Sequence, residues 1–165
     1  MPDPAATVLR ADYANPAHAR DLIALLDAYA RDPMGGSHPL GDYAREHLVA
    51  RLAATPHAVS WLAYVDESPA GLINAFVGLS TFAARPLLNL HDIAVLPAYR
   101  GRGLSRRLMD AAVAHARDLG CCKLTLEVLP GNTTACAVYR RFGFTGYELD
   151  PTLGGAQFWE KPLIR

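Results

Sequence analysis

The segment that most constrains the fold of this chain runs from residue 91 to residue 139. It holds an apolar strand, a turn rich in glycine and arginine at residues 100–105, a long helix and a second strand, in that order. A helix that begins directly behind a glycine-rich turn points unpaired N–H groups and its positive dipole end at one place, which suits a phosphate. This order of elements predicts a site for a phosphate-bearing cofactor.

The hydrophobic pattern of the whole chain predicts a mixed sheet flanked by helices, an α/β fold of the α+β kind. Apolar residues recur at helical spacing behind the glycine-rich turn, and Gly120 supplies a left-handed stop. Strand, helix and strand within residues 88–129 imply a right-handed crossover between parallel neighbours. The expected strands are residues 7–13, 58–65, 71–80, 88–96, 123–129, 144–149 and 156–163, and the expected helices begin near residues 16, 43, 104 and 132.

Composition limits the size of the fold and the kinds of partner. The 165 residues are 51% hydrophobic and 19% charged, which predicts a single domain, residues 1–165, with a substantial core. Sixteen basic residues balance sixteen acidic ones, a charge that does not favour tight binding to nucleic acid or a membrane surface. No apolar stretch reaches the roughly 18 residues of a membrane-spanning helix, which predicts a soluble, cytoplasmic protein.

The three cysteines predict reduced thiols, with neither a disulfide framework nor a metal site. Cys121 and Cys122 are neighbours and Cys136 stands apart, a spacing that differs from the pairs of a zinc site. Because Cys136 has no basic partner at a telling spacing, we interpret it as a small buried hydrophobe and not as a nucleophile. No metal is expected.

Two motifs in this order resemble the GNAT acyltransferase superfamily. Residues 100–105 match its (Gln/Arg)-x-x-Gly-x-(Gly/Ala) loop, except that Ser105 takes the sixth position, where a small side chain still lets the backbone approach a phosphate. The string Asn132-x-x-Ala135-x-x-x-Tyr139 matches the downstream signature. The resemblance covers residues 88–144 and implies the GNAT fold, with acetyl-CoA as the acyl donor.

The resemblance also implies where the cofactor binds. Two parallel strands would splay apart and admit the pantetheine arm, and a backbone N–H of the earlier strand would polarise the thioester carbonyl. Amides of the loop would hold the pyrophosphate, and the nearby arginines favour an anion. From the residues alone, a buried core strand and an ordinary turn before a helix remain alternatives. The predicted cofactor-binding residues are Ile93, Ala94, Val95, Arg100, Gly101, Arg102, Gly103, Leu104, Ser105, Asn132 and Tyr139.

Tyr139 is the candidate general acid. In the family the matching tyrosine lies near the cofactor sulfur and protonates the departing thiolate, whereas the alternative for Tyr139 is a packed aromatic residue of a helix. Asn132 is a good N-cap for the helix that it opens, and the family often uses the matching residue near the cofactor as well. Both roles of Asn132 are compatible.

A general base is expected because an alkylammonium with a pKa near ~10 has no lone pair to offer. Glu127 stands twelve residues before Tyr139, as does the proposed base of the ribosomal-protein N-terminal acetyltransferases that it resembles. His91 stands nine residues before Arg100, where polyamine-type members carry glutamate, and imidazole suits this task near neutral pH. A strand-end histidine bound by backbone is the alternative. Strand alternation places Asp92 on the face opposite His91.

The predicted function is transfer of acetyl from acetyl-CoA to a primary amine of a small molecule or peptide, by direct attack through a tetrahedral intermediate. Residues 32–41 and 150–155 would cover the acceptor, where Asp32, Asp42 and Glu46 could attract a cation, although solvated carboxylates are the simpler explanation. A non-catalytic acyl-CoA sensor or regulatory module is the alternative; a P-loop enzyme lacks support because the loop has no Gly-Lys-Ser/Thr ending. The family tendency is a homodimer.

Overall fold

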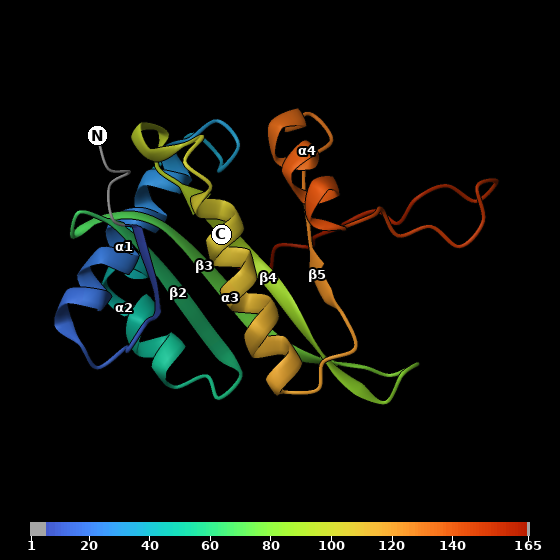
Figure 1. Ribbon diagram of the computed structural model, residues 1–165, viewed down its shortest axis with the longest axis horizontal. Coiled ribbons are helices and arrows are strands. Elements are labelled where there is room, and N and C mark those ends of the chain that lie inside the picture. The colour runs from blue at the N-terminus through green and yellow to red at the C-terminus, as the bar shows by residue number, and fades with distance from the viewer. Residues whose placement is uncertain (1–5, 165) are drawn as a thin grey trace. The chain divides into compact units, whose positions relative to one another are not determined.

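A mixed sheet in the order β1-β2-β3-β4-β5 forms the larger of two units of the chain (Figure 1). The structure is a computed structural model that describes residues 6–164, and its two units divide between Leu126 and Glu127. The first three pairings of the sheet are antiparallel, and β4 and β5 are parallel. The strands are β1 (Ala6–Arg10), β2 (Ala58–Val65), β3 (Ser68–Ser80), β4 (Arg85–Val95) and β5 (Leu124–Leu126).

Local sequence signals account for several boundaries in this unit. The Asn15 side chain accepts the Ala17 N–H at 2.9 Å, and a proline opens the first helix. Asp66 and Glu67 take φ values of +46° and +64°, the two-residue turn whose twist suits a hairpin between β2 and β3. The α-helices of the first unit are α1 (Pro16–Arg31), α2 (Asp42–Ala53) and α3 (Leu104–Asp118).

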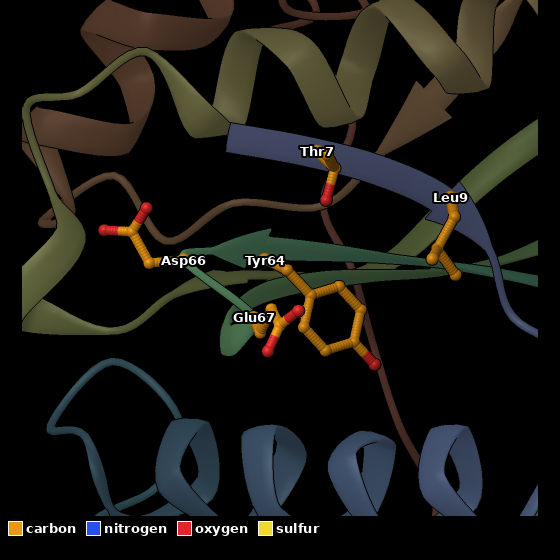
Figure 2. Close-up of a pocket in the computed structure, with 5 residues that line it drawn as sticks. All are labelled: Thr7, Leu9, Tyr64, Asp66 and Glu67. Atoms are coloured by element: carbon orange, nitrogen blue, oxygen red, sulfur yellow. The ribbon is translucent and has the colours of Figure 1, made fainter. Parts of the chain in front are cut away.

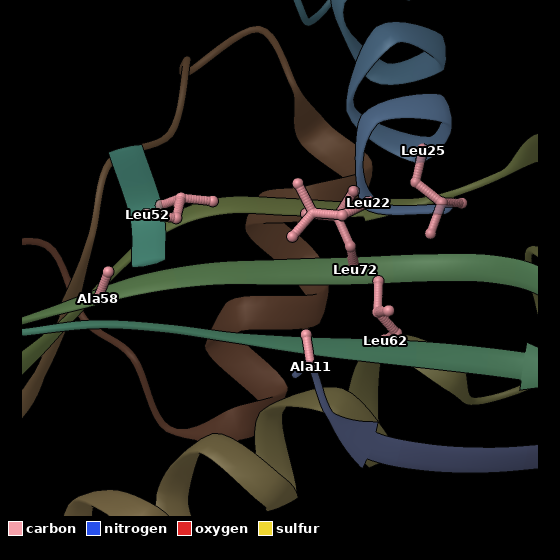
Figure 3. Close-up of a cluster of buried hydrophobic side chains, with 7 residues drawn as sticks. All are labelled: Ala11, Leu22, Leu25, Leu52, Ala58, Leu62 and Leu72. Carbon is pink, nitrogen blue, oxygen red and sulfur yellow. The ribbon is translucent and has the colours of Figure 1, made fainter. Parts of the chain in front are cut away.

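One face of the sheet packs against α1 and α2. Leu22 and Leu25 of α1 lie with Leu52 of α2 against Leu62 of β2 and Leu72 of β3 (Figure 3). Burying each of these side chains contributes about 1.5–3 kcal/mol. Because side chains alternate along a strand, Ser60 of β2 and Asn74 of β3, two positions from Leu62 and Leu72, share this face.

The other face of the sheet packs against α3. Trp61, the β2 residue next to Leu62, contacts His115 of α3 edge-on at 5.5 Å between ring centroids. Leu104, Leu108 and Met109 of α3 are at most 1% exposed, so one apolar stripe of the helix is buried as the spacing predicts. The crossover through α3 joins β4 and β5, whose parallel pairing confirms that part of the prediction.

The strand boundaries differ from the prediction at both ends of the sheet. β2 has the expected bounds, but β1 ends at Arg10 and β5 contains three residues where seven were expected. Glu127 therefore lies outside β5 and shares no strand face with Lys123 or Thr125. A strand persists only while a neighbour takes up its backbone hydrogen bonds, and the pairing of β5 with β4 ends at Leu126.

The second unit contains α4 (Thr133–Phe142) and a C-terminal segment. The two strands predicted for residues 144–149 and 156–163 are wrong, because that segment holds a single isolated bridge, between Glu148 and Gly155. Apolar side chains of the segment stay exposed, Phe158 at 71% and Trp159 at 81%. Alternating apolar residues make a strand only where a neighbouring strand and a core receive them.

None of the helices in the described part of the chain is both long and apolar enough to cross a membrane.

Candidate functional site

The glycine-rich turn, residues 100–105, leads into the N-terminus of α3 through two residues with left-handed backbone. Gly101 and Gly103 have φ values of +78° and +73°, in the left-handed region where other residues are strained. Gly103 is the N-cap of α3 and provides no side-chain cap, while burial of Leu104 fixes the helix start against the core. The first amides of α3, at Leu104 and Ser105, are therefore available to an anion at the positive end of the helix.

Arg100, the first residue of the turn, has structural partners. Its Nε donates to the Val95 carbonyl at 3.1 Å, and its Nη2 donates to Asp32 Oδ2 at 2.9 Å. This guanidinium lowers the pKa of Asp32. Arg100 thus joins the end of β4 to the segment that follows α1, in addition to any contact with an anion.

The other arginines near the turn form longer or less direct contacts than Arg100 does. Arg102 lies over the Tyr99 ring at 5.6 Å from the centroid, and Arg106 pairs with Asp110 at 4.0 Å. Both arginines are exposed, so their charged ends can reorient toward a phosphate with little loss. A further arginine, at position 107, donates to a backbone carbonyl of β1 at 3.0 Å.

β4 is longer than β5, its parallel neighbour, so the last residues of β4 have no paired strand on that edge. β5 pairs with β4 only as far as Leu90, whereas β4 continues to Val95. The Leu96 N–H donates to Ala70 on the β3 side at 2.9 Å. Strand alternation therefore directs the backbone groups of Ala94 to β3 and those of Ile93 and Val95 to the open edge. This edge can accept an extended partner, as the prediction for the pantetheine arm requires.

A β-bulge brings His91 and Asp92 to the same face of β4, which corrects the prediction that they face opposite sides. Asn74 pairs with Asp92 and Ala75 pairs with Leu90, so His91 is the extra residue. The His91 ring contacts Phe76 at 5.5 Å, and the Asn74 amide donates to Asp92 Oδ2 at 3.0 Å. Asn74 and Phe76 share the face that packs on α1 and α2, so both β4 side chains lie there as well.

A row of polar side chains runs across the sheet and ends at Asp92. Tyr13 contacts Ser60 Oγ at 2.9 Å, Ser60 donates to Asn74 Oδ1 at 2.6 Å, and Asn74 donates to Asp92. Because Ser60 has one proton and gives it to Asn74, Tyr13 is the donor to Ser60. Burial raises the pKa of Tyr13 and keeps this donor protonated. Every donor in the row therefore points toward the Asp92 carboxylate.

Sequence reasoning missed this row, although a signal for it was present. Ser60 and Asn74 are 1% and 2% exposed, and each stands alone among apolar residues in its strand. A polar side chain in a buried strand needs a partner. Only the register of three strands shows that these partners are each other and Asp92.

The candidate residues of the second unit lie on α4 and just after β5. Asn132 caps α4, since its side chain accepts the Ala135 N–H at 3.2 Å, which confirms the capping role. Tyr139 lies seven residues along the same helix, on the same side as Asn132, and its ring contacts Phe144 at 6.0 Å. Glu127 is exposed.

The segment between α1 and α2 is held by specific contacts. Asp27 accepts bonds from Arg31, Arg45 and the Leu40 N–H, and the Arg31 hydrogen bond is the main cause that lowers the pKa of Asp27. A side chain at Gly35 would collide with the last turn of α1. This glycine therefore serves close packing of the segment.

Two of the three carboxylates predicted to attract a cation remain exposed, while one is neutralised. Asp42 and Glu46 are exposed on α2, and Asp42 lies 3.9 Å from Arg45. Asp32 is paired with Arg100. Asp92 takes part in none of the ion pairs of residues 6–164.

A separate cavity of about 510 Å³ opens at the edge of the sheet (Figure 2). Thr7 and Leu9 of β1 line it together with Tyr64, Asp66 and Glu67 from the end of β2 and the turn that follows. The Tyr64 hydroxyl donates to Asp21 at 2.9 Å, and burial with this bond raises the pKa of Tyr64 to about 12. The cavity shares no lining residue with β4 or the glycine-rich turn.

Across residues 6–164, His, Cys, Asp and Glu form no group of three or more that could hold a metal ion.

The fold and the match to a family model identify the class of protein. A solved structure of aminoglycoside N-acetyltransferase AAC(6')-Iy in complex with CoA superposes with a TM-score of 0.73 over 98% of both chains, at 22% identity. That likeness shows the fold. The chain belongs to the acetyltransferase (GNAT) family, whose model matches residues 22–144.

Curated relatives match shorter segments. A streptothricin acetyltransferase of Streptomyces lavendulae is 40% identical over 90 residues, which are 54% of this chain and 48% of the relative. The N-alpha-acetyltransferase RimI of Mycobacterium tuberculosis is 35% identical over 57% of this chain and 56% of its own length. The chain therefore spans about half the length of these relatives.

Proposed function

We propose that this protein is an N-acetyltransferase that moves an acetyl group from acetyl-CoA to a primary amine of a small molecule or peptide. The observation that carries the proposal is the start of α3, where two left-handed glycines leave the first helix amides uncapped beside an open edge of β4. The family match extends from residue 22 to residue 144 across both units, which supports one functional domain that includes residues of both. That this domain is residues 1–165 and acts in the cytoplasm is part of the proposal.

The residues present fit the two ends of acetyl-CoA. Amides of residues 102–105 would bind the pyrophosphate, with Arg102 and Arg106 able to turn toward it. Backbone groups of Ile93 and Val95 at the open edge would bind the pantetheine arm as an added strand, and an N–H there would polarise the carbonyl. When bound, the cofactor supplies an acetyl group activated as a thioester.

Protein side chains would then move two protons. Tyr139 is proposed to give its phenolic proton to the leaving thiolate. His91 or Glu127 would take the proton of the acceptor amine, directly or through water. Support for His91 is its position on the bulge one residue before Asp92, exposed to solvent; Glu127 is supported by its spacing from Tyr139 and its exposure.

An amine acceptor is supported by the names of similar proteins, which include a streptothricin acetyltransferase and an aminoglycoside N-acetyltransferase. A panel of amines, including an aminoglycoside, streptothricin, a polyamine and a peptide N-terminus, should be assayed with acetyl-CoA while free thiol is detected. We expect thiol release that depends on one class of amine. Tight CoA binding by calorimetry without thiol release for any amine would favour the alternative, a non-catalytic acyl-CoA sensor. Sedimentation would test the proposed homodimer.

A further inference from the structure

Asp92 differs from Asp27 and Asp32 because no arginine forms an ion pair with it among residues 6–164. Asp27 and Asp32 each lie within 3.1 Å of an arginine nitrogen, so a cationic substrate would gain little by approaching them. Asp92 is half-buried and receives one hydrogen bond on Oδ2, from the neutral Asn74 amide. Its other oxygen, Oδ1, has no hydrogen-bond partner among residues 6–164.

The polar row orients this carboxylate. Burying Ser60 and Asn74 in the middle of a sheet costs desolvation that an apolar pair would avoid. The row therefore adds little to stability. Each of its side chains donates a hydrogen bond to the next, and the last, Asn74, donates to Oδ2 of Asp92. Such aligned hydrogen bonds limit the rotation of the carboxylate, which leaves Oδ1 in a defined position.

No cationic side chain of residues 6–164 forms an ion pair with that oxygen. Burial is the main cause that raises the pKa of the Tyr29 phenol in α1, and the nearby carboxylates of Asp92 and Asp32 raise it further. Tyr29 therefore stays neutral. His91 is next in the strand and its ring is against Phe76. Arg100 is bound to Asp32 and to the backbone of β4.

Asp92 also lies close to the proposed site of the thioester. One residue of a strand spans about 3.3 Å, and Ile93, whose backbone faces the open edge of β4, is the next residue. A cation held at Asp92 would lie beside the bulge, within a short distance of the N–H that is proposed to polarise the carbonyl. The bulge also brings His91 to the same face, where it can reach the proton of that cation.

We propose that Asp92 binds the cationic amine of the acceptor through the carboxylate oxygen that Asn74 does not use, and so selects acceptors that arrive as ammonium ions. Asn74, Ser60 and Tyr13 are positioning residues for this carboxylate. The inference rests on the proposed acetyltransferase function and adds the charge of the acceptor to it.

The experiment compares two acceptors of similar shape, an alkylamine and an alkoxyamine that is neutral near pH 7.5, with wild type and Asp92→Asn. We expect kcat/KM for the alkylamine to fall about tenfold or more through KM, since the loss of one ion pair in a partly buried site is worth about that factor. For the alkoxyamine, kcat/KM should change less than threefold. The ratio of the two values is independent of the fraction of folded enzyme, so partial unfolding does not mimic the result.

Three further variants sharpen the test. Asp92→Glu should recover part of the preference for the cation, and Asn74→Ala should weaken it while Asp92 keeps its charge. Asp118→Asn removes an exposed carboxylate at the end of α3 and should leave the ratio unchanged. An unchanged ratio in Asp92→Asn, with CoA affinity and rates otherwise intact, would overturn the inference alone. A wild-type protein that acetylates neither acceptor, nor any amine of the panel, would instead refute the proposed function.

Discussion

Replacing Gly103 should separate the cofactor site from the stability of the fold. Its φ of +73° costs a residue with a Cβ about 1–2 kcal/mol, and an added Cβ would meet no atom within 4 Å. Gly103→Ala should therefore lower the free energy of unfolding by about 1–2 kcal/mol without disturbing the core. Gly103→Asp carries the same backbone cost, offset by about 0.3–1 kcal/mol because a carboxylate is favourable at a helix N-terminus. Both variants should fold.

The effect of Gly103→Asp on cofactor affinity should be much larger than its effect on stability. Its carboxylate would compete with the pyrophosphate for the same amides and repel it. Two unit charges about 4 Å apart interact by about 4 kcal/mol at an effective dielectric constant of 20. Allowing for screening by salt, we expect the Kd for CoA to rise about a hundredfold or more, which corresponds to roughly 2.7 kcal/mol.

Gly120, at the other end of α3, provides the matched control. Its φ is +69° and a Cβ there would also meet no atom within 4 Å, so Gly120→Ala should cost the same in stability as Gly103→Ala. CoA affinity should not change, because that end of the helix presents carbonyl groups. Calorimetry with CoA and thermal unfolding should be measured for all three variants. If folded Gly103→Asp binds CoA like wild type, the pyrophosphate does not lie at the start of α3.

The remaining predictions concern proton transfer and the ion pair of Arg100. Tyr139→Phe should lower kcat by roughly tenfold to a thousandfold with little change in CoA affinity; an unaltered kcat, where chemistry limits turnover, would leave Tyr139 a packing residue. If Glu127 is the base, Glu127→Gln should lower kcat/KM most at neutral pH and recover partly at higher pH, whereas if His91 is the base, His91→Ala should abolish the acidic limb of the pH–rate profile. Unchanged profiles in both variants would exclude both residues. Because Arg100 lowers the pKa of Asp32 in the folded state, this carboxylate contributes stability that is present above its unfolded pKa near 3.8 and is lost as pH falls through the folded value. Wild type should therefore be more stable than Asp32→Asn at pH 7, and the difference should shrink as pH falls below about 3.8 in chemical unfolding; a difference that does not shrink with falling pH would contradict the assignment.

Several features of the site could be read from local chemistry. Gly120 predicts a left-handed stop behind the long helix, and its φ is +69°. The strand–helix–strand order predicts a parallel pair, which β4 and β5 form. Asn132 is a strong N-cap residue and caps α4. In each case the residues that decide the structure are neighbours in sequence.

Other features depended on partners that are distant in sequence. The alternation rule separated His91 from Asp92, but the pairing of β3 with β4 inserts a bulge and places them on one face. Arg100 suggests a phosphate ligand by its place in the motif, yet it also bonds Asp32, 68 residues away. The last two predicted strands did not form because a strand needs a neighbour, which composition does not reveal.

By itself, the sequence determined the glycine-rich turn, the helix behind it and the crossover between parallel strands, because backbone φ preferences and hydrophobic periodicity act over a few residues. Only the tertiary structure decided which carboxylates are neutralised and which remains available. Charge cancellation and hydrogen bonding depend on distances of about 3 Å between side chains, and strand register sets those distances. Tyr13, Ser60, Asn74 and Asp92 become one row because three strands align, although 79 residues separate its ends.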